Sequence, residues 1–275
     1  MSNGSSLFNL TGWGKIVVGI FLLFIAVLWS VPMFSALYNS LKFAGFKNYV
    51  YVLSSSLNGV YFFHALINSF TIAAIAVFLT SSVSALAGFC FSKIQFPYRN
   101  TFYILTLSLL SIPGVTILIP LFFTLKKIGL NNTFFAIALP QVALTLPFGV
   151  LLMRNAFDTI HNDFMAAASI DGANIYQVFW KIYLPMNIPA VINLAILQFV
   201  WSFQDFLLPS FLLSKRSLTT ATQMISSFNR TQTISPKDIG AYNAGIVLLA
   251  VPVIIVFLIF STYIKKGLTS GGIKG

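Results

Sequence analysis

Residues 166–185 read Ala166-Ala-Ala-Ser-Ile-Asp-Gly-Ala-Asn-Ile-Tyr-Gln-Val-Phe-Trp-Lys-Ile-Tyr-Leu-Pro185, a polar stretch between two long apolar segments. The small residues from Ala166 to Ile170 predict a short helix, which Asp171-Gly172 ends because glycine accepts a left-handed backbone. A second short helix follows and closes at Pro185. Its apolar residues share one helical face, namely Ile175, Val178, Phe179 and Ile182. The stretch therefore predicts a two-helix loop that a partner can grip from outside the apolar segments.

The composition of the whole chain predicts an integral membrane protein. Of its 275 residues 57% are hydrophobic and only 8% are charged, which leaves too little polar surface for a soluble protein of this length. Apolar runs long enough to cross a hydrocarbon layer of about 30 Å predict an all-α fold with six spans. These spans are expected near residues 16–38, 67–92, 102–125, 134–153, 188–213 and 241–264.

The net charge of +11 comes from 16 basic and 5 acidic residues. The cations are scattered among short loops, which favours contacts with lipid headgroups and partner proteins over nucleic acid. With the N-terminus inside, the six spans leave equal numbers of Lys and Arg on the two sides. The positive-inside rule therefore does not set the orientation.

The residue inventory argues against a catalytic or metal centre. The sequence has no Gly-x-x-x-x-Gly-Lys-Ser/Thr phosphate loop, so any ATP hydrolysis is expected on another chain. Cys90, the one cysteine, lies in the second predicted span and is interpreted as a packing residue. The two histidines, His64 and His161, receive no role, and we predict no cofactor and no metal.

The loop resembles the cytoplasmic coupling loop of ABC importer permeases. The pattern of that family runs roughly Glu-Ala-Ala, two residues, Asp-Gly-Ala, then a helix that closes in Leu-Pro. Here Ala166 replaces the acidic residue of the family, and Asp163 is the nearest acid upstream. The other positions match, namely Ala167-Ala168, Asp171-Gly172-Ala173, Phe179, Ile182 and Leu184-Pro185.

The resemblance covers nearly the whole chain and is specifically to the smaller, six-span permease of carbohydrate importers, as in the maltose system. The C-terminal run from Gly267 to Gly275 and the coupling loop are its most specific parts. The other matching positions are Asn48-Tyr49, Asn68-Ser69, Phe96-Pro97, Ile112-Pro113, Ile119-Pro120, Gly129-Leu130, Pro147-Phe148-Gly149, Trp201 and Asp205-Phe206.

The resemblance implies the type I ABC importer permease fold as a single transmembrane domain over residues 1–275. It also implies four kinds of partner: a second permease in a heterodimer, two ATPase subunits that bind ATP and Mg, an extracytoplasmic solute-binding protein and the lipid membrane. The chain is expected in the cell membrane, with both termini and the 154–187 loop in the cytoplasm. The solute is expected to be a sugar or a related polyol or glycoside.

Two regions are expected to contact the ATPase. For the loop, the resemblance implies contacts by Phe164, Ala166, Ala167, Ala168, Asp171, Gly172, Ala173, Phe179, Ile182 and Pro185. An exposed Phe179-Trp180 pair would be costly unless a partner covers it. The alternative is a surface helix pair that merely connects two spans.

The second region is the tail, residues 265–275, which the resemblance implies enters the ATPase interface. Its glycines predict a segment too flexible to hold structure alone. The expected contacts are Gly267, Gly271, Gly272 and Lys274. The alternative is a frayed terminus.

Polar and aromatic groups inside the spans are candidates for the solute path, because polar groups are costly in a membrane. Sugar hydroxyls need hydrogen-bonding partners, and the apolar faces of sugar rings stack on aromatic side chains. The candidates are Asn68, Gln141, Gln198, Trp201, Gln204 and Asp205. The alternative is that these groups bond neighbouring helices to one another, or, for Asp205, that it is simply solvated.

Other functions remain open. An ion-coupled secondary transporter needs ionisable groups at mid-membrane, and Asp205 is the one acid in a predicted span. An ABC importer for a non-carbohydrate solute fits the loop equally well. An intramembrane enzyme would need a catalytic pair or metal cluster that the sequence does not offer.

Overall fold

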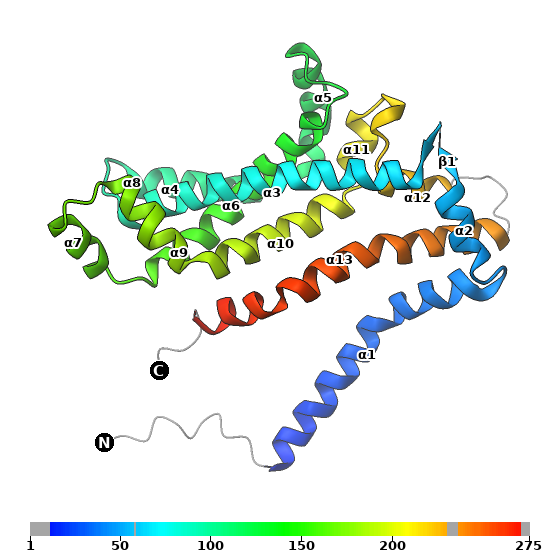
Figure 1. Ribbon diagram of the computed structural model, residues 1–275, viewed down its shortest axis with the longest axis horizontal. Coiled ribbons are helices and arrows are strands. Elements are labelled where there is room, and N and C mark those ends of the chain that lie inside the picture. Colours follow the sequence, from blue (N-terminus) through cyan, green and yellow to red (C-terminus); the bar gives the residue numbers. More distant parts are fainter. Residues whose placement is uncertain (1–11, 58, 230–235, 271–275) are drawn as a thin grey trace.

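The computed structural model describes residues 12–57, 59–229 and 236–270. Its main body consists of helices that run along the long axis of the molecule (Figure 1). They are α3 (Phe62–Lys93), α4 (Arg99–Ser108), α6 (Phe135–Asp158), α10 (Ile188–Gln204) and α13 (Pro236–Ser270). The N-terminal helix α1 (Gly12–Lys42) diverges from this body and meets α13 beside α2 (Lys47–Ser54).

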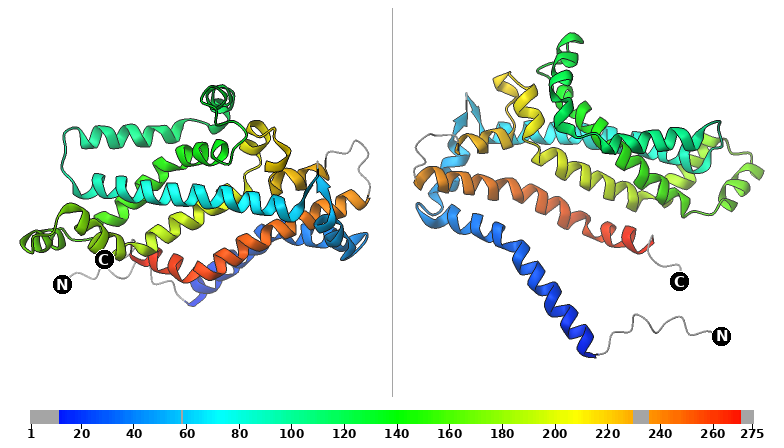
Figure 2. Two further views of the ribbon diagram at one scale, coloured as in Figure 1. Left: turned by 45° about the horizontal axis from the view of Figure 1, so that its top comes forward. Right: turned by 180° about the vertical axis from the view of Figure 1, so that it is seen from behind.

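The two ends of the body carry different short elements, as both views in Figure 2 show. At one end lie α7 (Asp163–Ile170), α8 (Ile175–Val178), the π-helical turn η3 (Phe179–Tyr183) and α9 (Leu184–Met186). At the other end lie α2, the antiparallel pair β1 (Ser56–Leu57) and β2 (Val60–Tyr61), and α12 (Ala221–Ser227). Near that end α11 (Leu207–Leu212) and η4 (Arg216–Leu218) continue from α10.

The predicted all-α membrane fold is confirmed. Within the described residues, four helical stretches are long and apolar enough to cross a membrane: α1, α3, α6 and residues 238–263 of α13. Two bent pairs also qualify when each is taken as one span. One pair joins Arg99–Ser111 to Gly114–Lys127 at 90°, and the other joins Ile175–Met186 to Ile188–Gln204 at 74°.

The span predicted over 102–125 is broken at Pro113, one of the two prolines that mark it as irregular in the sequence. The helix ends in the 3-10 turn η1 (Leu109–Ser111), and Ile112 is extended. The following Pro113 disfavours helical backbone at Ile112 and supplies no N–H to a continuing helix. The chain then re-enters helix through η2 (Gly114–Ile117) and α5 (Leu118–Lys127) in a new direction.

The expected span over 188–213 is also divided. Helix α10 stops at Gln204, Asp205 is extended, and α11 begins two residues later at Leu207. At its other end, the helix that precedes α10 continues past Pro185 to Met186, so the prediction that Pro185 ends it is wrong. Pro185 supplies no N–H to this helix, which passes through the π-helical turn η3 just before it and ends one residue after it.

Helices α3 and α6 approach each other most closely where one of them carries glycine. A Cβ built on Gly88 of α3 would lie 2.6 Å from the Cβ of Met153 and 2.8 Å from the backbone nitrogen of Arg154. A Cβ on Gly149 of α6 would overlap the Ser84 hydroxyl. Small residues of this kind let membrane helices pack backbone to backbone.

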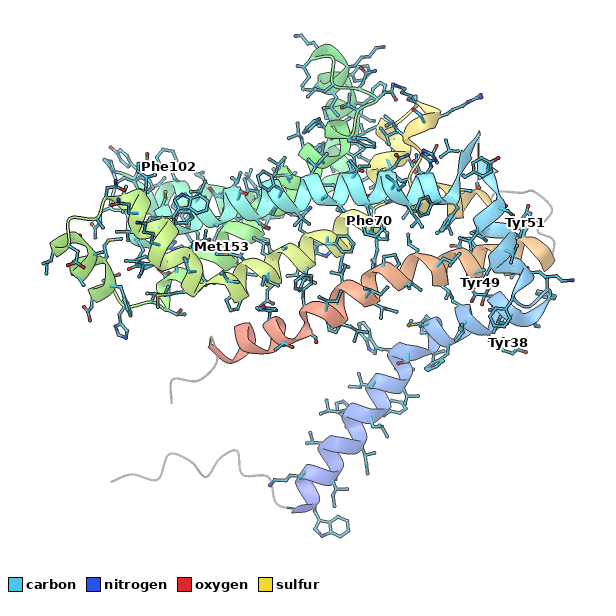
Figure 3. The ribbon with its side chains drawn as sticks, viewed as in Figure 1. Tyr38, Tyr49, Tyr51, Phe70, Phe102 and Met153 are labelled. Atoms are coloured by element: carbon cyan, nitrogen blue, oxygen red, sulfur yellow. The ribbon has the colours of Figure 1, made fainter. Side chains whose placement is uncertain are left out.

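Helix α1 leaves nearly all of its apolar surface uncovered by the rest of the chain. Its most apolar window is 0% buried, and only Ala36 and Ser40 are buried. Figure 3 shows its side chains standing clear of the body, with Tyr38 near the end where Tyr49 and Tyr51 gather. There the Asn48 amide donates to the Ser40 carbonyl at 2.8 Å and fixes α1 against α2.

We expect Gly88→Ala to destabilise the protein by about 1–3 kcal/mol, because the added methyl group overpacks the contact between α3 and α6. The measurement is the temperature at which half of the detergent-purified protein loses its monodisperse elution peak. Gly19→Ala on α1 is the matched control, since nothing lies within 4 Å of its Cβ position. Equal thermal shifts for the two variants would contradict the close packing at Gly88.

Candidate functional site

The loop between α6 and α10 forms two short helices around a glycine turn. Gly172 has φ +73°, so the predicted left-handed turn is confirmed. Helix α8 then starts from a reciprocal cap, in which Asn174 Oδ1 accepts from the Gln177 backbone N–H and Gln177 Oε1 accepts from that of Asn174, each at 2.9 Å. The Gly172 turn and the Asn174–Gln177 cap together set the angle between the two helices.

The aromatic face of the second helix turns inward. Phe179 is only 4% exposed and packs against Phe89 of α3, with ring centroids 5.1 Å apart. Phe157 of α6 and Tyr183 of η3 complete the cluster, and both lie within 6 Å of the Phe89 ring. The aromatic cluster, defined as Phe89, Phe157, Phe179 and Tyr183, joins the loop to two body helices.

This burial corrects the expectation that Phe179 and Trp180 form an exposed aromatic patch. The stripe of Val178 and Phe179 covers the end of the body, and Ile182 packs beside it. On the opposite face of this helix Tyr176 is 75% exposed and Trp180 is 61% exposed, and Ile170 at the end of α7 is 86% exposed. None of these three residues was among the predicted contacts. The signal for Tyr176 and Trp180 in the sequence is that they lie four residues apart, away from the apolar stripe.

The other predicted coupling residues divide between the same two faces. Ala168 is buried and Ala173 is partly buried against the body. The exposed ones are Phe164, Ala166, Ala167, Asp171, Gly172 and Pro185. Asp163 opens α7 one turn before Ala166, so a carboxylate lies on the same side of the helix as the position where the resemblance expects an acid.

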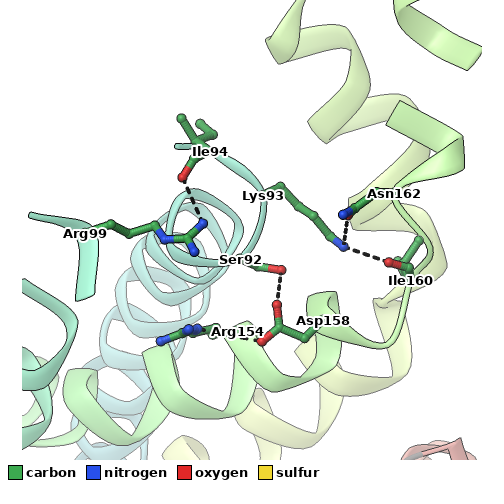
Figure 4. Close-up of polar contacts among 8 residues, drawn as sticks. All are labelled: Ser92, Lys93, Ile94, Arg99, Arg154, Asp158, Ile160 and Asn162. Atoms are coloured by element: carbon green, nitrogen blue, oxygen red, sulfur yellow. Dashed lines mark hydrogen bonds and ion pairs between the residues drawn. The ribbon is translucent and has the colours of Figure 1, made fainter. Parts of the chain in front are cut away.

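Polar contacts tie the start of the loop to the end of α3 (Figure 4). Lys93 Nζ donates to the Ile160 carbonyl at 2.7 Å and to Asn162 Oδ1 at 2.8 Å, and lies 5.4 Å from the centroid of the Tyr183 ring. The Ser92 hydroxyl donates to Asp158 Oδ1 at 2.6 Å, and Asp158 also pairs with Arg154 at 3.7 Å. The loop is therefore fastened at its first turn as well as at Phe179.

The C-terminal segment differs in part from its prediction. Helix α13 continues through Gly267 to Ser270, so residues 265–270 are helical where a flexible tail is expected. The remaining predicted tail contacts, Gly271, Gly272 and Lys274, lie outside the described residues.

A cavity of about 240 Å³ lies beside α10, between α6 and the bend before α5. It brings together four of the six predicted path residues: Gln141, Gln198, Trp201 and Asp205. Ser202 and Thr145 also line it and were not predicted, because an isolated hydroxyl in a span gives no distinctive signal. Its apolar walls come from Val115, Leu118, Leu144, Leu207 and Leu208.

Most polar groups of this cavity bond to one another. The Gln141 amide donates to Asp205 Oδ2 at 2.8 Å and its oxygen accepts from the Ser202 hydroxyl at 2.6 Å. Asp205 Oδ1 accepts from the backbone N–H groups of Leu207 and Leu208, which begin α11. Asp205 therefore holds the break between α10 and α11 and is not simply solvated.

The remaining two path candidates lie elsewhere. The Asn68 amide is buried and donates to the carbonyls of Ser217 and Thr219, both at 2.9 Å. It holds the η4 segment on α3, so its role in this structure is helix-to-loop bonding. Gln204 is exposed at the end of α10 and does not line the cavity.

The sequence as a whole places this architecture in a known family. The family model for the binding-protein-dependent transport system inner membrane component matches residues 81–270. The chain belongs to this family. The match spans the coupling loop, the cavity and helix α13, so both candidate sites lie within a transport permease.

Relatives and solved structures agree with this assignment. Over 229 residues the permease is 33% identical to the trehalose/maltose transport system permease protein MalG of Thermococcus litoralis, covering 83% of this chain and 81% of the relative. It is 33% identical over 210 residues to the arabinooligosaccharides transport system permease protein AraQ of Halalkalibacterium halodurans, covering 76% and 73%.

Its fold matches a chain in the crystal structure of a bacterial ABC transporter involved in the import of the acidic polysaccharide alginate. The TM-score is 0.75 at 22% identity, covering 91% of this chain and 96% of that chain. The predicted fold class, that of type I ABC importer permeases, is thereby confirmed.

We expect Phe179→Ala to destabilise the permease by about 3–5 kcal/mol, because it removes the ring that fills the aromatic cluster. Trp180→Ala should change stability by less than about 0.5 kcal/mol, since its side chain is largely exposed. Both are measured as shifts in the thermal unfolding midpoint in detergent. A larger shift for Trp180→Ala than for Phe179→Ala would mean that the two rings have been assigned to the wrong faces.

Proposed function

We propose that the permease is a transmembrane subunit of an ATP-driven importer that carries a sugar or a related polyol or glycoside into the cell. The observation that carries the proposal is the exposed face of Ile170, Tyr176 and Trp180 at one end of a membrane-spanning body. The sugar class is supported by relatives whose names specify trehalose, maltose and arabinooligosaccharides.

The exposed face suits an ATPase groove. Apolar surface in water costs roughly 25 cal/mol per Å², and large side chains on a short helix are common anchors at protein interfaces. In this proposal α10 alone forms the span of its bent pair and the face lies on the segment before it, so lipid tails are not expected to cover the face. We infer that Phe164, Ile170, Tyr176 and Trp180 supply the apolar contacts, with Ala166, Ala167, Asp171, Gly172 and Pro185 at their borders.

The inward residues transmit the movement of the ATPase to the spans. Because Phe179 packs on Phe89 of α3 and Phe157 of α6, a displacement of the loop moves the ends of both helices. Ala168, Ala173 and Ile182 add contacts to the same packed unit. Lys93 fastens the first turn of the loop to α3, which limits independent motion of the two.

The acid that the family places at Ala166 has a nearby substitute in Asp163. Asp163 lies one helical turn earlier on α7 and is exposed. We infer that the Asp163 carboxylate takes the role of that acid toward a cation on the ATPase.

The complete transporter is proposed to contain a second permease in a heterodimer, two ATPase subunits and an extracytoplasmic binding protein. ATP and Mg bind to the ATPase subunits. The permease itself is proposed to lie in the cell membrane with six spans: α1, α3, the bent pair Arg99–Ser111 with Gly114–Lys127, α6, α10 and α13. Both termini and the 154–187 loop are proposed to lie in the cytoplasm. The tail residues Gly267, Gly271, Gly272 and Lys274 are proposed to contact the ATPase pair.

The cavity beside α10 is proposed to face the solute path. Gln141, Gln198, Trp201 and Asp205 line it and combine hydrogen-bonding groups with an aromatic ring. Asn68 and Gln204 are not part of this proposal.

Co-purification tests the proposed assembly directly. The tagged permease, extracted from its own cells in mild detergent, is expected to bring down a second permease and an ATPase. The double variant Tyr176→Ala/Trp180→Ala should lose the ATPase and keep the second permease, because only the exposed loop face is altered. Recovery of the wild-type chain alone would count against the proposal.

We expect Gly172→Pro to uncouple ATP hydrolysis from uptake while the chain still inserts. Proline fixes φ near −65° and cannot adopt the +73° of this turn, so α7 and α8 must change their relative angle. Uptake per ATP hydrolysed is measured in proteoliposomes. Gly129→Pro, in another left-handed turn with φ +74° away from the loop, is the control for damage to a turn as such. Unchanged coupling in the Gly172→Pro variant would contradict the assignment.

A further inference from the structure

The cavity beside α10 contains one amide without a partner. Its other amide, hydroxyl and carboxyl groups are paired: Gln141 with Asp205 and Ser202, and the Thr145 hydroxyl with the Gln141 carbonyl at 2.8 Å. Among such groups lining the cavity in the described part of the chain, only Gln198 has neither its Oε1 nor its Nε2 bonded within the protein.

This unpaired state is costly. Gln198 is 1% exposed and both of its amide atoms are shielded from solvent, so the side chain must turn about its own bonds before a molecule in the cavity can reach them. A buried polar group without a partner costs about 1–3 kcal/mol. Interhelical bonding, the usual reason for an amide in a span, requires a partner on a neighbouring helix, and Gln198 has none in this structure. A bound molecule that pairs the amide would recover the cost.

The hydrogen-bonding groups of the Gln198 amide indicate what kind of molecule can bind beside it. The side chain offers a donor, Nε2, beside an acceptor, Oε1, and two adjacent hydroxyl groups can accept from one and donate to the other. Trp201 lines the same cavity, and its ring is held edge-on against Phe148 with centroids 5.6 Å apart. An indole so fixed can stack on the apolar face of a sugar ring.

The size of the cavity limits what enters. Its volume of about 240 Å³ is below the roughly 300–1,000 Å³ of pockets that hold drug-sized ligands. One ring-sized unit fits this space, and a longer saccharide would extend beyond it.

We propose that this cavity is a solute subsite carried by this chain itself, in which the Gln198 amide reads a pair of adjacent hydroxyls on one uncharged ring while Trp201 stacks on that ring. The subsite rests on the proposed function of sugar or polyol uptake. It makes Gln198 the specificity-determining residue of this half of the path, with the Gln141–Asp205 pair holding the wall.

Saturation-transfer NMR tests the subsite on the purified transporter in lipid nanodiscs, with all the subunits that accompany the chain. The probes are methyl α-D-glucopyranoside and its 2,3-dideoxy analogue, which lacks the adjacent ring hydroxyls at those positions. The wild type should bind the glucoside saturably and about tenfold more tightly than the dideoxy analogue. Gln198→Leu should abolish this preference.

Asn193→Leu is the matched control, because Asn193 also has a buried unpaired Oδ1 on α10 but does not line the cavity. It should keep the tenfold preference. A wild type that binds neither probe saturably, or a Gln198→Leu variant that keeps the preference, would overturn the subsite.

The same purified transporters, wild type and variants, are also reconstituted into sealed proteoliposomes and assayed for ATP-dependent uptake of the sugar mixture carried by the binding protein. If uptake depends on ATP but the preference for the glucoside does not depend on Gln198, the proposed subsite is wrong and the proposed importer function stands. Uptake that needs no ATP removes the proposed function independently of the binding result.

Discussion

The packing of Phe179 onto Phe89 and Phe157 is the contact that joins the loop to the membrane helices, and the proposed coupling depends on it. It brings the loop between α6 and α10 into the same packed unit as α3 and α6, the two helices that approach each other closely enough to require Gly88 and Gly149. Helices packed this closely move together as a rigid body when a force acts on one of them, because a densely packed interior cannot deform continuously. The aromatic cluster therefore fixes the direction in which force on the loop reaches the membrane body, and the Lys93 contacts keep the loop from turning about it.

The same body contains the polar groups that a solute path needs. Asp205 ends α10, receives the first N–H groups of α11 and accepts from Gln141, so one carboxylate organises both the break in the helix and the wall of the cavity. The loop and the cavity are joined by α6, since its Phe157 belongs to the aromatic cluster and its Gln141 to the cavity wall. Movement of the loop end of the body can thus alter the cavity without a separate moving part.

The sequence predicted features governed by composition and by local backbone chemistry. The scarcity of charge indicated a membrane protein, the left-handed turn at Gly172 followed from its position after a short helix, and four of the six polar or aromatic candidates in spans do meet in one cavity. Prediction from the sequence failed where either the membrane spans or a partner protein could bury the same residues. A periodic apolar stripe shows that one face of the loop helix is buried, but not whether the spans or a partner bury it, and Phe179 packs on the spans. For Asn68 the sequence left open a place in the path or a bond to a neighbouring segment, because its partners Ser217 and Thr219 are about 150 residues away in the chain. Pro113 and Pro120 marked this span as irregular, but the 90° bend could not be predicted, because a proline in a membrane helix can kink it, break it or leave it continuous, depending on its neighbours.

The central claim is that force enters this permease from an ATPase through the loop. The most direct measurement is solute uptake into sealed proteoliposomes that contain the co-purified complex, with the loaded binding protein outside. One set of vesicles holds ATP and Mg in its lumen, which corresponds to the cytoplasm, and a parallel set is energised by an ion gradient alone. The account predicts uptake with ATP, no uptake with the gradient, and loss of the ATP-driven signal in the Tyr176→Ala/Trp180→Ala variant. Equal uptake under an ion gradient without ATP would contradict it and identify an ion-coupled transporter.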